Sequence, residues 1–217
     1  MSQPAPSPAP PAGFPAPGSF AFALTLGGRI AGEQSWQIAP EKHAWLVRVQ
    51  TDFGGVLPQV RRVQTSRLHP RRLHSLGYTE SEPGRGNPTF ETTFDVKTGL
   101  VTVKRGKDEA SGPLTADHHD PVSLLLWLRT LEGEDRAEVR MVGGHVYVSR
   151  LADAALHGRA ARVYFLRPGG AYVYVEDTPE RRLLRLIQPT DFGPVQADWK
   201  EARAQRPEGQ GPRRRRR

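Results

Sequence analysis

Four consecutive polar residues, Asp117-His118-His119-Asp120, form the most reactive cluster in the sequence. Imidazole and carboxylate groups bind divalent metals and transfer protons, so the cluster raises the question of a metal or catalytic site. Adjacent side chains of an extended loop point in opposite directions, which makes it hard for the two histidines to bind one ion. Further ligands, such as His145, would have to come from elsewhere, and no His-x-x-x-His or His-Glu-x-x-His spacing occurs. The sequence therefore predicts polar loop residues here and no metal site.

The same cluster ends in the start of a helix. Asp at the N-cap accepts hydrogen bonds from free backbone N–H groups, and Pro121 at the first helical position loses none. The next turns carry large apolar side chains on nearly every side: Leu124, Leu125, Leu126, Trp127, Leu128 and Leu131. We predict a helix near residues 121–131, stopped by Gly133 and enclosed by the rest of the chain.

Other catalytic patterns are missing from the sequence. There is no cysteine, no Gly-x-Ser-x-Gly elbow and no phosphate-binding glycine loop, and Ser123 falls in the first helical turn, where hydroxyls bond to backbone. Glu91 and Asp95 could pair as carboxylates, but strand alternation places them on an outward face. We predict no catalytic residue and no cofactor. An unrecognised hydrolase stays open, since any two strands can bring carboxylates together.

Apolar residues recur mainly with a period of two, which indicates strands. The segment 89–96 alternates Phe90, Thr92, Phe94 and Val96 against polar residues, and Gly99 supplies the turn of a hairpin. Similar segments follow one another with short turns. The sequence predicts a mainly all-β fold: a strongly curved antiparallel meander, barrel or half-barrel of about ten strands, with one short buried helix.

The two ends of the chain differ from its middle. Residues 1–18 hold seven prolines and no charge, which predicts a disordered Pro/Ala-rich linker. Residues 200–217 have almost nothing apolar to bury and predict a disordered Arg-rich tail. Residues 19–199 remain as a single β-rich domain.

A curved sheet gathers side chains on its concave face, which either fill that face or hold an apolar ligand. We expect self-filling, because the leucine-rich helix also needs a place, with a lipid-like molecule as the alternative. The candidate ligand-binding residues are Trp36, Trp45, Phe90, Phe94, Trp127, Tyr172 and Tyr174. We therefore predict a non-enzymatic binding or scaffolding module, and a role in the cell envelope is one option for it.

Charge supports an alternative function. The formal net charge is +8, but residues 200–217 carry eight Lys or Arg and two Glu, so most of that charge belongs to the tail. A nucleic-acid-associated protein, or one that contacts anionic membrane weakly, would use this tail and the basic stretch that begins at Arg61. That stretch has no aromatic residue for base stacking. The candidate residues are Arg61, Arg62, Arg67, Arg71, Arg72, Arg213, Arg214, Arg215, Arg216 and Arg217.

Four segments in order resemble a bacterial family of exported, β-rich domains of unknown function. They are LGGRIAGEQSW, SRLHPRRLHSLGYTE, TFETTFDVKTGLVTV and DHHDPVSLLLWLR, and the resemblance covers roughly residues 19–195. It implies a curved antiparallel sheet around one helix, loosely similar to bacterial lipoprotein carriers, and no established activity. The sequence departs from that family in its Arg-rich tail and in having no export signal.

The compartment follows from the start of the sequence. As the sequence stands we expect a cytoplasmic protein; a true start upstream of Met1 would make it an envelope or periplasmic one. The oligomeric state is left open.

Overall fold

The computed structural model describes residues 12–84 and 87–200, which form one antiparallel sheet and one α-helix. The first eight strands are β1 (Gly18–Leu26), β2 (Arg29–Glu41), β3 (Ala44–Phe53), β4 (Arg61–Leu68), β5 (Ser75–Ser81), β6 (Phe90–Asp95), β7 (Leu100–Arg105) and β8 (Asp108–Pro113). After α1 (Pro121–Leu128) come β9 (Arg136–Met141), β10 (Gly144–Arg150), β11 (Ala154–Leu156), β12 (Arg159–Arg167), β13 (Ala171–Glu176), β14 (Leu183–Thr190) and β15 (Gly193–Lys200).

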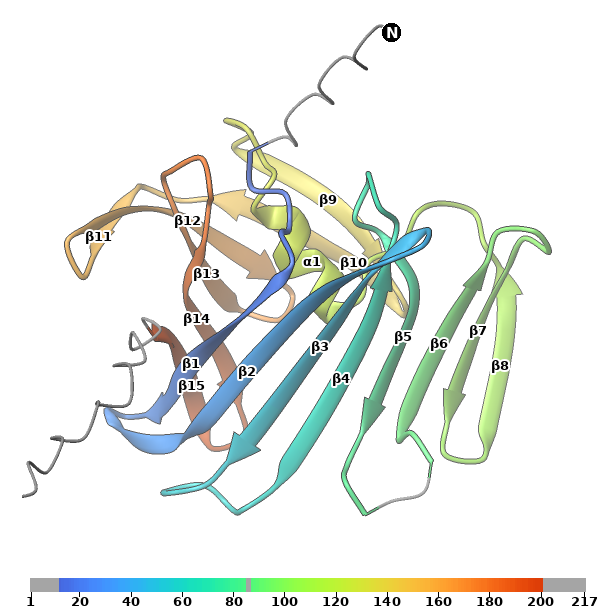
Figure 1. Ribbon diagram of the computed structural model, residues 1–217, viewed down its shortest axis with the longest axis horizontal. Coiled ribbons are helices and arrows are strands. Elements are labelled where there is room, and N and C mark those ends of the chain that lie inside the picture. The colour runs from blue at the N-terminus through green and yellow to red at the C-terminus, as the bar shows by residue number, and fades with distance from the viewer. Residues whose placement is uncertain (1–11, 85–86, 201–217) are drawn as a thin grey trace, which may run out of the picture.

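The sheet runs in the order β8-β7-β6-β5-β4-β3-β2-β1-β15-β14-β13-β12-β10-β9, with β11 paired to β12. Most neighbours are hairpins along the chain, while β1 pairs with β15 and so joins the two halves. The sheet curves strongly around α1 but does not close (Figure 1). Its two edges, β8 and β9, are successive strands in the chain, so one connection has to cross from edge to edge.

That crossing connection, residues 114–135, contains α1 and ties two remote strands together. The backbone carbonyl of His118 accepts a hydrogen bond of 2.8 Å from Ser75 N at the start of β5. The amide of His119 donates to the carbonyl of Arg140 on β9 over 2.7 Å. The connection therefore bridges the gap between β5 and β9, and we call this line of contact the seam. Strands β6–β8 extend beyond it and are called the overhanging strands (Figure 1).

The N-terminus of α1 is fixed by its cap. Asp120 Oδ1 accepts hydrogen bonds of 2.8 Å from the amides of Val122 and Ser123, and the hydroxyl of Ser123 accepts from Asp120 N, which completes a capping box. The other carboxylate oxygen, Oδ2, accepts from the hydroxyl of Ser66 on β4 over 2.5 Å. One side chain thus both starts the helix and attaches it to the sheet.

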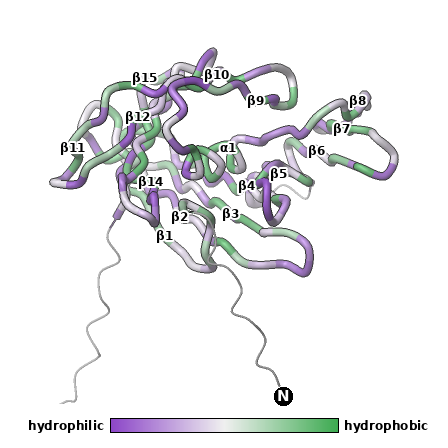
Figure 2. Tube along the Cα trace, turned by 90° about the horizontal axis from the view of Figure 1, so that it is seen from above, coloured by the Kyte–Doolittle hydropathy of each residue, from purple (hydrophilic) through white to green (hydrophobic). Residues whose placement is uncertain are grey.

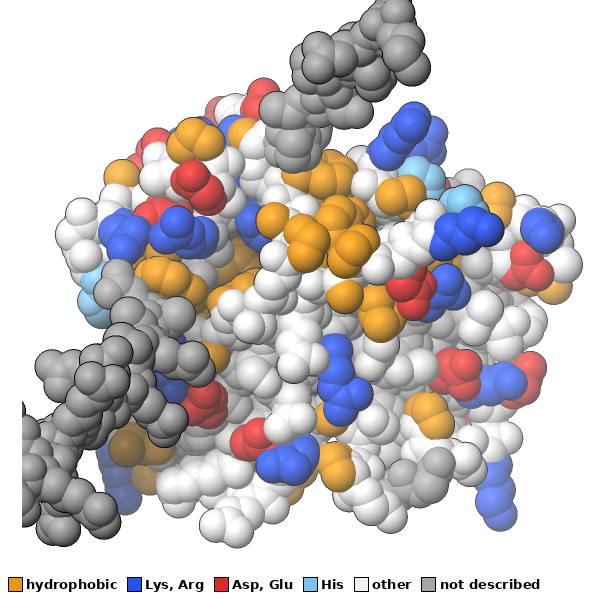
Figure 3. Space-filling view, in the orientation of Figure 1, with side chains coloured by type: hydrophobic (Ala, Val, Ile, Leu, Met, Phe, Trp, Pro, Cys, Tyr) orange, Lys and Arg blue, Asp and Glu red, His pale blue; other side chains and the backbone are white. Residues whose placement is uncertain are grey.

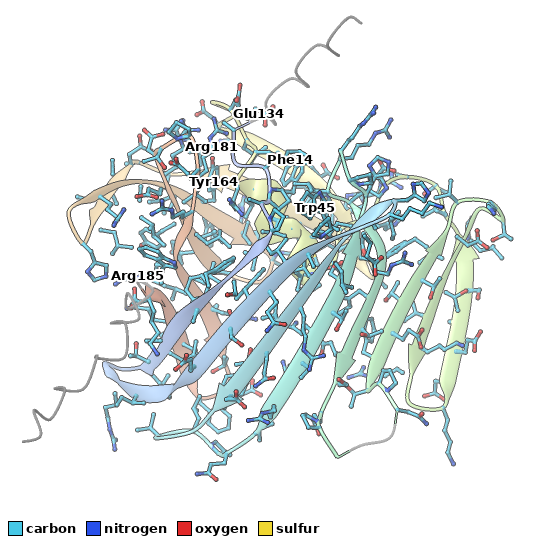
Figure 4. All side chains as sticks on the ribbon, viewed as in Figure 1. Phe14, Trp45, Glu134, Tyr164, Arg181 and Arg185 are labelled. Atoms are coloured by element: carbon cyan, nitrogen blue, oxygen red, sulfur yellow. The ribbon has the colours of Figure 1, made fainter. Side chains whose placement is uncertain are left out.

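The C-terminus of α1 is held by two buried arginines. Arg181 Nη1 donates to the carbonyls of Leu131 (2.9 Å) and Arg129 (3.3 Å), while Arg129 Nε donates to the carbonyl of Arg181 (2.8 Å). Cations near helix carbonyls satisfy the groups that the helix leaves unpaired. Figure 4 shows Arg181 with Phe14 and Tyr164 at this end of α1. The helix ends at Leu128, so the predicted stop at Gly133 was wrong; the turn after Arg129 ends it first.

The N-terminal segment also belongs to the folded unit. Gly13 N donates to the carbonyl of Pro179 over 3.0 Å, and Phe14 packs against the core. A Cβ on Gly13 would lie 2.0 Å from the carbonyl oxygen of Arg129, so only glycine permits this approach. The contact lies before residue 19, where the predicted domain begins, and the proline-rich composition gives no sign of it. The rest of the predicted linker, residues 1–11, and of the predicted tail, residues 201–217, lies outside the described residues.

The concave face of the sheet, which faces α1, forms the core. Leu124, Leu126 and Leu128 are buried there among side chains from both halves of the sheet, such as Trp36 and Tyr164. Seen from above, strands surround α1 on several sides (Figure 2). The mainly antiparallel fold with one buried helix is confirmed. Within the described residues, no helix has the length and apolar character required to cross a membrane.

The predicted number of strands, about ten, was too low, since residues 12–84 and 87–200 form fifteen. β8 has the sequence DEASGP and is almost wholly exposed, so it carries no alternation of apolar residues. β11 has three residues, which is too short for a periodic pattern. These strands form through pairing with neighbours and not through their own apolar pattern.

The double role of Asp120 can be tested by replacement with alanine. The change removes the helix cap and leaves the buried hydroxyl of Ser66 without an acceptor, so we expect the free energy of unfolding in urea to fall by about 3 kcal/mol. Asp95→Ala is the matched control, because Asp95 caps an exposed turn by accepting from Lys97 N and Thr98 N. Its loss should be clearly smaller; equal losses would show that Asp120 does not anchor the helix.

Candidate functional site

A cavity of about 400 Å³ lies along the seam, where the overhanging strands face the crossing connection. We call it the seam pocket. Its apolar wall consists of Phe90 and Phe94 from β6, Pro121 at the start of α1, and Met141 and Val142 at the end of β9. Small-molecule sites are usually apolar with a few polar groups, and the lining of this pocket is about evenly apolar and polar.

One polar wall of the pocket is a fixed carboxylate on β5. Tyr78 OH donates to Glu80 Oε1 and itself accepts from Gln64 Nε2 over 2.6 Å. Burial and the neighbouring Glu80 raise the pKa of Tyr78, so its hydroxyl stays protonated and keeps donating. Glu80 therefore presents its carboxylate in a defined position.

A second polar group in the pocket has no partner. Thr92 on β6 is 2% exposed, and its hydroxyl has no hydrogen-bond partner among the described residues. Leaving a buried hydroxyl unpaired costs about 1–3 kcal/mol. Since Thr92 lines the seam pocket, a bound molecule with a polar group could satisfy it.

His119 forms the floor of the pocket beside the helix cap. Its Nδ1 lies 3.3 Å from Ser123 Oγ, and the Ser123 hydroxyl lies nearer, at 3.0 Å, to the carbonyl of Asp120. Since Ser123 has one proton and donates it to that carbonyl, Nδ1 of His119 donates to Ser123 and Nε2 is left as an acceptor. Burial, with the nearby His74, lowers the pKa of His119 to about 4, so its ring is neutral.

Asp120 is a structural group in this site. Burial raises the pKa of its carboxyl, and the hydrogen bonds from Ser66, Ser123 and Val122 oppose that rise. Every one of these donors belongs to the helix start or to β4. Ser123 itself is fully buried, which leaves no path for a substrate to reach its hydroxyl. Asp120 and Ser123 therefore hold a wall of the pocket in place.

The neighbouring His118 turns away from His119. Its ring stacks on Phe94 with centroids 5.6 Å apart, whereas the His119 ring lies 5.4 Å from that of Trp127. His145, considered as a further ligand, pairs instead with Glu138 on β9. In the part of the chain that the structure describes, no group of three or more His, Asp or Glu side chains is arranged to hold a metal ion.

The predicted cleft residues divide between the pocket, the core and the outer surface. Phe90 and Phe94 line the seam pocket. Trp36 is 1% exposed, stacks on Phe20 and donates its indole N–H to Gln34, so it is a core residue. Trp45 and Trp127 are half-buried against the core, and Trp45 lies beside α1 (Figure 4).

Tyr172 and Tyr174 lie on the convex face, so their predicted place in the concave cleft was wrong. On β13 the concave positions are taken by Val173 and Val175, both 1% exposed. Tyr172 instead packs on Phe165, and Arg185 lies over the ring of Tyr174. Both faces of this strand carry apolar or aromatic residues, so alternation alone does not show which face is buried.

The basic stretch that begins at Arg61 is largely paired. Arg61, Arg67 and Arg72 form ion pairs with Asp52, Glu41 and Asp117, respectively. Figure 3 shows positive and negative side chains interspersed on one face, with apolar ones gathered near α1. Arg62 and Arg71 complete the predicted set within the described residues, and the predicted Arg213–Arg217 lie outside them. The folded part therefore offers no continuous positive surface along this stretch.

The fold defines a class: an open, barrel-like antiparallel sheet wrapped around one helix. Among solved structures, the chain is similar to a beta-barrel-like protein of a domain of unknown function, DUF1849, from Brucella abortus, with a TM-score of 0.56 and 9% sequence identity. The match covers 84% of this chain and 95% of that one. No family model matches the sequence, and a comparison with curated proteins finds no match. The likeness supports the fold, in line with the expected β-rich family of unknown function.

Several pocket residues were not predicted from the sequence. Glu80, Arg105 and Met141 come from three segments whose neighbourhood depends on the register of remote strands. Thr92 gave one usable signal, because it is a polar residue between Phe90 and Phe94 on an otherwise apolar strand face.

The lowered pKa of His119 predicts a loss of stability in acid. The unfolded chain takes up the proton near pH 6.5 and the folded one only near 4, so the free energy of unfolding should fall by about 3 kcal/mol as pH drops through that window. His119→Asn keeps a donor near the Nδ1 position but does not titrate. Urea unfolding at pH 7 and pH 4 should show a smaller pH effect for the variant; an identical effect would exclude His119 as its source.

The nucleic-acid alternative makes its own prediction. Because three of the five arginines in the basic stretch are paired, replacing the other two, Arg62 and Arg71, by Gln should leave any mobility shift of DNA or RNA unchanged. Removing residues 206–217 should abolish it, and the shift should fade with rising salt. Binding that survives the truncation would place a nucleic-acid site on the folded part.

Proposed function

We propose that this protein is a non-enzymatic binding module for a small amphipathic, lipid-like molecule held in the seam pocket. The pocket offers an apolar wall around Phe94 and Met141 and polar groups at Glu80 and Thr92. The observation that carries the proposal is the buried, unpartnered hydroxyl of Thr92, a residue in the wall of this cavity beside the carboxylate of Glu80.

We place the ligand in the seam pocket and not on the concave face around α1, where the sequence analysis considered it. The concave side of the sheet around α1 is filled by Leu124, Leu126 and Leu128, which are at most 4% exposed. A molecule the size of a full acyl chain has no room beside them. The seam pocket has about 400 Å³, which suits a polar head group with a short apolar part.

The compartment is an open part of this proposal, with the cytoplasm and the cell envelope as the two candidates. Cell fractionation of the natural gene product, with periplasmic and cytoplasmic markers, separates these two cases. The result also decides which lipids can reach the pocket.

Replacement of Thr92 by valine tests the proposed site. Valine has nearly the same shape and no hydroxyl, so stability should stay equal or rise by about 1 kcal/mol, because an unpaired buried group is removed. Affinity for short amphiphiles should fall by about tenfold, because the hydrogen bond to the ligand is lost. Calorimetric titration with octanoate, octylamine and dihexanoyl phosphatidylcholine, all below their micellar concentrations, measures this change.

The matched control is Thr93→Val, since Thr93 is exposed on the opposite face of the same strand. It should leave the affinity unchanged. If none of the three amphiphiles binds the wild-type protein, the proposed function is overturned. If they bind equally well to wild type and Thr92→Val, the seam pocket is not where they bind.

A further inference from the structure

Three side chains that line the seam pocket stand in one row across three strands. Glu80 on β5 is opposite Phe90 on β6. The pairing of Glu91 with Lys104 brings Phe90 opposite Arg105 on β7. All three line the pocket, so a carboxylate and a guanidinium flank an aromatic ring.

The two charges in this row are available to a ligand. Glu80 is held in place by Tyr78 and Gln64, which are neutral donors, and Arg105 has no ion-pair partner among the described residues. The other titratable groups of the pocket add no net charge at its surface, because His119 is neutral and the carboxylate of Asp120 is enclosed by its cap bonds. The pocket therefore has one negative and one positive end.

The spacing of the row sets the size of what fits. Two steps between neighbouring strands amount to about 10 Å. That is the spacing of the two backbone positions; charged groups held at the same spacing, with a contact of about 3 Å at each end, leave roughly 4 Å between the charges of the ligand. A two-carbon link between an ammonium and a phosphate or carboxylate spans that distance.

We infer that the seam pocket recognises a zwitterionic head group, with its ammonium between Glu80 and the Phe90 ring and its phosphate or carboxylate at Arg105. An ammonium is attracted both by a carboxylate and by the face of an aromatic ring, and a guanidinium binds oxyanions in a planar, two-bond arrangement. Thr92, in the next row, meets the link or the ester beyond it, and the apolar part lies against Phe94 and Met141. This inference rests on the proposed function and names its ligand class.

Two lipids with the same short tails separate charge recognition from tail binding. Dihexanoyl phosphatidylethanolamine carries both charges, and dihexanoyl phosphatidylglycerol carries only the phosphate. In calorimetric titrations we expect the wild-type protein to bind the first about tenfold more tightly, because the ammonium contact adds a charge-assisted bond. Glu80→Gln should remove this preference, and Arg105→Gln should weaken both lipids by a similar factor.

Matched controls come from the opposite face of the same strands. Glu91→Gln and Lys104→Gln change equivalent charges at the next positions along β6 and β7 and should leave both affinities unchanged. Thermal unfolding checks that each variant is folded. Glycerophosphoethanolamine, which lacks tails, distinguishes the sources: competition at comparable concentration identifies a soluble zwitterion, and failure to compete identifies a lipid.

Equal affinity of the wild-type protein for the two lipids would overturn the inference while leaving the proposed function intact. A preference that persists in Glu80→Gln would overturn it as well. No binding of either lipid, or of the amphiphiles used above, would reject the proposed function itself.

Discussion

The carboxylate of Asp120 is the constraint on which the rest of the structure depends. It accepts from the first amides of α1 and from Ser66, a residue 54 positions earlier on β4. A buried carboxylate without such donors would be costly, so helix start and sheet are fixed to each other. Because α1 lies in the only connection between the two edge strands, this attachment also decides where the crossing chain runs and which strands it bridges.

The seam pocket exists because the crossing connection takes this path. The connection ties β5 to β9 through the backbone of His118 and His119, three strands before the sheet ends. The concave side chains of β6–β8 are therefore covered only in part, as where His118 stacks on Phe94. The leucines of α1 fill the concave face only as far as the seam. At the seam, polar groups such as Glu80 and Thr92 lie beside aromatic rings. The site is a consequence of an open sheet and would vanish in a closed barrel.

The sequence predicts those features that depend on local pattern. Alternation predicts the antiparallel sheet, and Asp120-Pro121 predicts the helix start, because each depends on neighbouring residues. The faces of β13 escape prediction, since Val173 and Tyr172 are both suited to burial and only packing against Phe165 or the core decides between them. The row from Glu80 to Arg105 could not be predicted for another reason. It depends on the register of three strands, which no single segment of the sequence specifies.

The two regions of the concave face also differ in what a substitution would do there. Around α1, tight packing means that a change of side-chain size alters stability, because no space exists to absorb it. At the seam, Glu80 borders a cavity and Thr92 lies buried in its wall, so we expect their replacement to change the lining of the cavity while the fold remains. The same sheet therefore combines a tightly packed scaffold with an open pocket wall, and the helix cap at Asp120 is the boundary between them.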